Sequence, residues 1–124
     1  MGDRANFGFK DRKGDIVFLY GHWAGHRMLE NLANAVEAAR PRWNDESYAT
    51  RIAISHMVGD EWTSETGWGI SVNQLADNEH KVPIINWKEQ TFTLMEEDLQ
   101  TIVFESSLDS FVNKYSQLEE PVMV

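Results

Sequence analysis

Residues 16–39 read IVFLYGHWAGHRMLENLANAVEAA, and within them the pattern changes from that of a strand to that of a helix. Residues 16–20 form an almost continuous apolar run, which is typical of a strand buried on both faces. From about residue 26 to residue 40 the apolar positions recur at helical spacing, and Pro41 ends the pattern. The sequence therefore predicts a strand that enters an amphipathic helix through a corner at residues 20–27.

Further elements are expected on both sides of this corner. The run at 99–104 fits either a strand or a helix. The other expected elements are strands at 5–10, 68–72, 82–87 and 91–94, and helices at about 45–58 and 108–117. Together they predict an α+β fold, with an antiparallel sheet of about five strands, two consecutive helices inserted after the first hairpin, a C-terminal helix, and the helices on one side of the sheet. We expect one domain over residues 1–124, with the tail from about residue 118 loosely attached.

Composition restricts the classes of partner. The 124-residue chain has no cysteine, which excludes disulfides and thiolate metal sites and fits a reducing compartment. We expect no signal peptide, and no run approaches the roughly 18 apolar residues of a membrane span. The net charge of −9 falls entirely within residues 61–124. Such an acidic field repels a phosphate backbone, so we expect no nucleic-acid polymer and no membrane as partner.

The corner holds the first candidate binding site. Backbone amides at a helix start are unpaired and partly positive, so they can hold an anion. Trp23 can stack on a flat ring, and Arg27 can add a counter-charge. The alternative is that the indole fills the core and the glycines only turn the chain. The candidate ligand-binding residues here are Tyr20, Gly21, His22, Trp23, Gly25, His26 and Arg27.

A second group of polar residues, Asp77, Asn78, Glu79 and His80, is expected in a loop before a strand. These side chains can close over the first site and contact hydroxyls or ring edges of a ligand. They can equally form Asx turns at the start of the strand, which is the commoner use of such residues.

Metal binding and catalysis have weaker support. Imidazoles at 22, 26 and 80 and the carboxylates of Asp77 and Glu79 are suitable ligand types, but they show no metal-site spacing. The serines lie in no nucleophile-elbow context, and nothing in the spacing demands an acid–base pair such as Glu65 with Glu79. We name no catalytic residue, no metal and no cofactor, and we expect a chain that binds rather than catalyses.

Five segments together resemble a family of small uncharacterised proteins that are common in bacteriophages and in some bacterial genomes. The segments are Arg4-Ala5-Asn6, Tyr20-Gly21-His22-Trp23, Arg42-Trp43-Asn44-Asp45 with the following 48–52, Glu65-Thr66-Gly67-Trp68-Gly69-Ile70-Ser71, and Asp77-Asn78-Glu79-His80. The resemblance implies a setting rather than an activity: a phage accessory protein in the host cell cytoplasm that interferes with host functions or defence.

The leading expectation is a phage-type protein that holds a small anionic, nucleotide-like ligand at the corner. One alternative is a protein–protein inhibitor of a host factor that uses the acidic second half, and a second is a small metal-dependent hydrolase. Five tryptophans in a small domain favour apolar surface that remains to be buried, so a homo-oligomer is expected.

Overall fold

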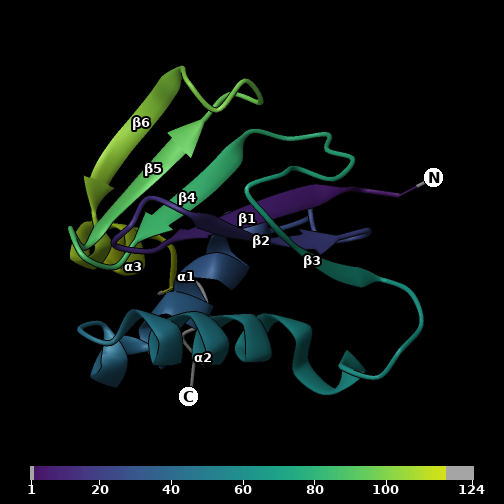
Figure 1. The fold of residues 1–124 in the computed structure, drawn as a ribbon, viewed down its shortest axis with the longest axis horizontal. Helices are drawn as coiled ribbons and strands as arrows, with labels where there is room; N and C mark the ends of the chain where they lie inside the picture. Colours follow the sequence, from purple (N-terminus) through teal and green to yellow (C-terminus); the bar gives the residue numbers. More distant parts are fainter. Residues whose placement is uncertain (1, 117–124) are drawn as a thin grey trace, which may run out of the picture.

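The structure is a computed structural model that describes residues 2–116, and these residues form a six-stranded mixed sheet and three α-helices (Figure 1). The expected α+β class is confirmed. The predicted loose tail from residue 118 lies outside the described residues. The elements are β1 (Ala5–Lys10), β2 (Ile16–Gly21), α1 (Met28–Ala38), η1 (Arg40–Arg42), α2 (Glu46–Val58), η2 (Gly59–Glu61), β3 (Trp68–Val72), β4 (Val82–Asn86), β5 (Thr91–Met95), β6 (Ile102–Ser107) and α3 (Leu108–Tyr115).

The sheet differs from the prediction in strand number and in the direction of one pair. Its order is β3-β2-β1-β4-β5-β6, and β1 pairs with β4 in parallel while the other pairs are antiparallel. The chain leaves β2, passes through α1, α2 and β3, and returns beside β1 in the same direction. Residues 102–104 of the ambiguous run at 99–104 begin the sixth strand, β6, whereas Leu99 has a positive φ of 58° in the turn that leads back along β5.

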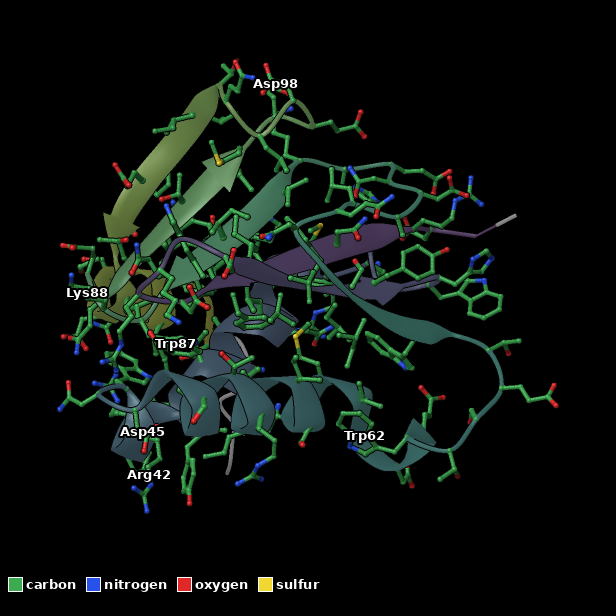
Figure 2. All side chains as sticks on the ribbon, viewed as in Figure 1. Arg42, Asp45, Trp62, Trp87, Lys88 and Asp98 are labelled. Atoms are coloured by element: carbon green, nitrogen blue, oxygen red, sulfur yellow. The ribbon has the colours of Figure 1, made fainter. Side chains whose placement is uncertain are left out.

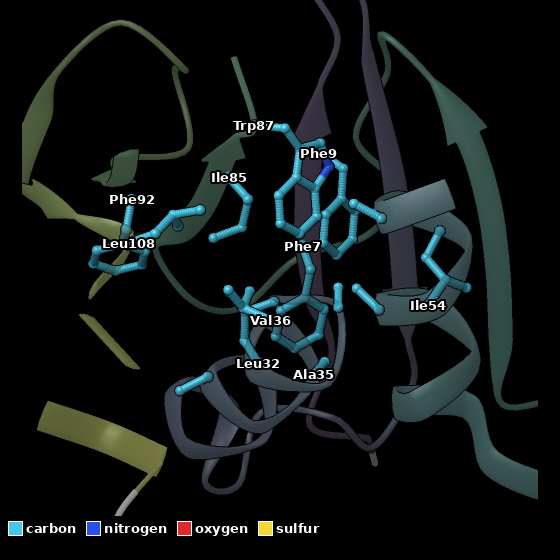
Figure 3. Close-up of a cluster of buried hydrophobic side chains, with 14 of the residues drawn as sticks. Phe7, Phe9, Leu32, Ala35, Val36, Ile54, Ile85, Trp87, Phe92 and Leu108 are labelled. Atoms are coloured by element: carbon cyan, nitrogen blue, oxygen red, sulfur yellow. The ribbon is translucent and has the colours of Figure 1, made fainter. Parts of the chain in front are cut away.

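The main hydrophobic core joins one face of the sheet to residues from all three helices (Figure 3). Phe7 and Phe9 of β1 are buried in it together with Trp87 at the end of β4, and the Phe9 and Trp87 rings stack with centroids 6.1 Å apart. The indole N–H of Trp87 donates to Oγ1 of Thr50 on α2 at 2.9 Å. A buried aromatic side chain contributes about 1.5–3 kcal/mol by leaving water, so this layer fixes α2 against the sheet.

A smaller cluster covers part of the opposite face. Phe18, Val82 and Ile84 are buried there, and partly buried side chains from the 73–81 loop and the β5–β6 turn pack against them. The carboxamide of Asn6, on the same face, donates to the carbonyl of Asp77 at 3.0 Å and to Oδ1 of Asn78 at 3.1 Å. The long polar loop is therefore held against β1.

Helix ends follow local chemistry. The first helix is shorter than the predicted 26–40, because Arg27 takes a left-handed conformation with φ of 56° and because the chain after Ala38 tightens into η1, which contains Pro41. The second helix begins one residue later than predicted and ends at Gly59, whose φ is 66°. Within residues 2–116 no helix has both the length and the apolar character that a bilayer crossing requires.

Candidate functional site

The corner between β2 and α1 presents an indole to solvent. Trp23 is 64% exposed, so it does not fill the core. The imidazole of His22 packs against it edge-on, with ring centroids 4.3 Å apart and planes at 81°. The hydroxyl of Tyr20 hydrogen-bonds with Nδ1 of His22 at 2.9 Å. Tyr20 thus orients His22, and His22 supports the inner edge of the exposed indole.

Both glycines of the corner allow other parts of the chain to approach closely. A Cβ on Gly21 would collide with Ala24 and would lie 2.8 Å from the ring of Trp68. A Cβ on Gly25 would collide with the side chains of Asp3 and His80. The amide of Gly25 donates to the carbonyl of Asp3 at 2.9 Å. The contacts at these two positions are therefore with the protein's own residues.

The 77–80 segment is tied to the start of the chain. Glu79 accepts from the amide of Arg4 at 2.8 Å and lies 3.4 Å from its guanidinium, while Asp77 lies 3.8 Å from the same group. Asn78 donates to the carbonyl of His80. Nε2 of His80 lies 2.6 Å from Oδ1 of Asp3, and the amide of Asp3 donates to the carbonyl of His22 at 2.7 Å. The corner and the 77–80 segment, far apart in the sequence, meet through Asp3.

The exposed indole lines a cavity of about 240 Å³. The opposite aromatic side chain is Trp68 at the start of β3, whose indole N–H donates to Oε1 of Glu61 at 2.6 Å. The cavity is also lined by Ala24, by Asn31 and Asn34 of α1, and by His56 and Met57 of α2. It therefore lies where the corner, two helices and an edge strand come together.

Three polar side chains of the cavity are available to a ligand. The carboxamides of Asn31 and Asn34 and the imidazole of His56 form no hydrogen bond with any other residue in the described range 2–116. Carboxamides and imidazole both donate and accept, so they can match the polar edge of a heterocycle. Small-molecule sites commonly combine aromatic side chains, such as these two indoles, with a few polar groups that line the same space.

Arg27 is the residue directly before α1. Its carbonyl accepts the hydrogen bond of the Asn31 amide at 3.0 Å, which places it one helical turn before Asn31. Asn31 and Asn34, three residues apart, lie on one side of the helix, whereas Arg27 has a left-handed backbone and does not line the cavity. His26 and Arg27 are both exposed. The corner thus combines an aromatic cavity with an arginine at the start of α1, the positive end of the helix dipole.

Glu79 and His80 line a different space. Together with Glu96 and Glu97 they border a groove of about 560 Å³ on the other side of the α1 start. The 77–80 segment therefore lies next to the corner but does not line the cavity of Trp23. Among residues 2–116, no three His, Asp or Glu side chains group closely enough to hold a metal ion.

Several cavity residues had no role in the sequence-based site. Asn31, Asn34, His56 and Met57 lie in expected helices, and Trp68 begins an expected strand. The repetition of Asn31 and Asn34 on one side of α1 is the signal that points to them. Their convergence with His56 depends on how α1 packs on α2, which no local pattern encodes.

Comparisons of the chain with protein-family models, with curated proteins and with solved structures find no match. The functional argument therefore depends on the geometry of the corner and on the chemistry of its side chains.

Proposed function

We propose that this protein binds a small ligand with a flat ring and an anionic group, as in a nucleotide, at the corner between β2 and α1. The ring stacks on Trp23 inside the cavity, and Asn31, Asn34 and His56 contact its polar edge. The anionic group lies outside, towards Arg27 and the start of α1. The sequence resemblance adds the setting of a phage accessory protein that acts in the host cell.

The observation that carries this proposal is the exposed indole of Trp23 over a cavity. A tryptophan that is 64% exposed gains little from hydrophobic burial, yet His22 and Tyr20 hold this one in place. Such an arrangement favours a contact that forms only when a ligand is present.

The cavity size indicates which part of the ligand it receives. Sites for drug-sized ligands have volumes of about 300–1,000 Å³. The 240 Å³ here is below that range and suits one ring system rather than a whole nucleotide. The remainder of the ligand then extends along the exposed side of α1, past Asn31 to Arg27.

Calorimetric titration with a panel of nucleotides and the matching nucleosides tests the proposal. Trp23→Ala should weaken the best ligand about fivefold or more, because base–aromatic stacking contributes about 1–3 kcal/mol. Arg27→Ala should weaken the nucleotide but leave the affinity of the nucleoside unchanged, since only the nucleotide carries the anion.

Trp62→Ala is the matched control, because Trp62 is 50% exposed and does not line this cavity. It should leave the affinity unchanged, and the melting temperatures of the Trp23 and Trp62 variants show that both fold. Absence of binding across the panel, or equal losses in the Trp23 and Trp62 variants, contradicts the proposed site.

A further inference from the structure

Trp68 forms a second aromatic wall of the corner cavity, and its ring is held at two edges. Its indole N–H donates to Oε1 of Glu61 at 2.6 Å. An edge of its six-membered ring lies against the main chain of Gly21, where an added Cβ would be 2.8 Å from Cζ3 of the indole. The ring is therefore oriented before a ligand arrives, and together with Trp23 it gives the cavity two indoles.

The hydrogen bond to Glu61 increases the electron density of the Trp68 ring. Its acceptor is a carboxylate, and a hydrogen bond to an ionised group polarises the donor more strongly than a bond between neutral groups does. The faces of an indole already carry partial negative charge, and tryptophan is the side chain whose face attracts a cation best. Two indoles around one cavity, one of them bonded to a carboxylate, therefore favour a positively charged ring over a neutral one.

The charged groups around the cavity favour the same kind of ring. Among residues 2–116, no Asp, Glu, Lys or Arg side chain lines it, and the imidazoles at the cavity are those of His56, which lines it, and His22, which packs on Trp23. The charged residues within four positions of a lining residue are Arg27, Glu30, Glu37, Asp60, Glu61 and Glu65. Glu37 is paired with Arg40 at 2.9 Å. The remaining charges still leave an excess of carboxylates, which attracts a cation.

We propose, building on the nucleotide binding proposed above, that the flat ring held at the corner carries a positive charge. The ligand is then a zwitterionic nucleotide, in which a cationic heterocycle is joined through a sugar to a phosphate. The pyridinium ring of a nicotinamide nucleotide and the ring of an N-alkylated purine belong to this class. The charged ring lies between Trp23 and Trp68, and the phosphate lies outside the cavity towards Arg27, so each end of the ligand meets groups of opposite polarity.

A pair of isomeric ligands tests the charge of the ring at constant size. Near neutral pH the ring of 1-methyladenosine 5′-monophosphate is positively charged, whereas that of its isomer N6-methyladenosine 5′-monophosphate is neutral. In calorimetric titration the charged isomer should bind about fivefold or more tightly than the neutral one, which is the factor expected of one partly desolvated cation–π contact. Oxidised nicotinamide mononucleotide, with its pyridinium ring, should bind more tightly than its reduced form, whose ring is neutral, by a similar factor.

Variants of the aromatic wall show which groups select the charge. Glu61→Gln keeps an acceptor for the Trp68 N–H but removes the negative charge, so it should narrow the ratio of the two isomers' affinities. Trp68→Leu keeps an apolar wall without an aromatic face and should narrow the ratio further. Glu89→Gln is the matched control, because it makes the same charge change on the exposed β4–β5 turn and should leave the ratio unchanged. Circular dichroism confirms that each variant is folded.

The outcomes separate this inference from the proposed function. Equal affinities within both ligand pairs overturn the positive ring while nucleotide binding itself stands. Absence of binding by every nucleotide contradicts the proposed function, and this inference fails with it. A preference for the charged ring that Glu61→Gln and Glu89→Gln reduce equally also overturns the inference, because the overall negative charge of the chain, and not the indole walls, would then select the ligand.

Discussion

Asn6 shows how one residue positions a whole loop. Its side chain is 0% exposed, and among residues 2–116 Asn6 is the only polar residue that is buried. Its Nδ2 donates to Asp77 and Asn78, and its Oδ1 accepts from the amide of Ala76 at 3.3 Å. All of these partners belong to the loop that precedes β4, so this carboxamide sets the path by which the chain approaches the corner.

We predict that Asn6→Ala lowers the free energy of unfolding by about 1–3 kcal/mol, because it leaves main-chain groups of the loop unsatisfied. Urea unfolding measures the change. Asn113→Ala, at an exposed position on α3, should change stability by no more than about 0.5 kcal/mol. Similar values for the two variants would show that the carboxamide does not hold the loop.

Asp98 closes the β5–β6 turn (Figure 2). Its carboxylate accepts from the amides of Thr101 at 2.9 Å and Gln100 at 2.8 Å and from the Thr101 hydroxyl at 2.9 Å. These bonds, led by that from the Thr101 amide, lower the pKa of Asp98 from its ordinary value of 3.8. The stability that they contribute is present above that value and is lost as the pH falls through the folded-state pKa.

Asp98→Asn should therefore reduce the free energy of unfolding at neutral pH, and the deficit relative to the unmodified chain should shrink as the pH is taken below 3.8. Urea unfolding over a series of pH values measures it. A deficit that stays constant across the series contradicts the role given to the ionised carboxylate.

At the residue scale, the sequence predicted the corner but not all of the residues that line its cavity. Trp23 stands out because glycines, imidazoles and a guanidinium surround it at the end of an apolar run. Asn31, Asn34 and His56 look like ordinary helical polar residues. They come together around the cavity only through the packing of α1 on α2, two helices whose buried residues include Ala33 and Ala53.

Among the elements, α3 depends on a side-chain cap. The hydroxyl of Ser107 accepts from the amide of Ser110 at 3.1 Å, at the point where β6 ends and the helix begins. We predict that Ser107→Ala lowers the free energy of unfolding by about 1 kcal/mol. Urea unfolding of the variant checks this value.

The neighbouring serine is the control for the cap. Ser106 donates to the carbonyl of Ser107 at 3.0 Å, and among residues 2–116 no helix amide donates to its hydroxyl. Ser106→Ala should therefore change stability by no more than about 0.5 kcal/mol. A loss at 106 that equals the loss at 107 would mean that the helix start does not depend on the cap.

The elements themselves were mostly predictable, because strand and helix periodicities are local. The run at 99–104, in which β6 begins, was ambiguous, since a short apolar run without alternation fits both types. The parallel pairing of β1 with β4 was missed for a different reason. It joins segments separated by α1, α2 and β3, and each segment alone is compatible with an antiparallel neighbour.

At the scale of the whole molecule, the sheet offers two distinct surfaces. The corner of β2 and α1 presents an aromatic cavity, and the outer edge of β3 presents unpaired main-chain groups. Trp68 contributes to both, because its side chain lines the cavity and its main chain lies at the edge.

The most direct test of ligand binding follows individual side chains by two-dimensional ¹H–¹⁵N NMR during titration with a nucleoside monophosphate. The indole N–H signal of Trp23 and the side-chain amides of Asn31 and Asn34 should shift and saturate together, while the indole signal of Trp62 should stay in place. Shifts centred on Trp62, or no saturable shift at millimolar ligand, would contradict a binding site at the corner.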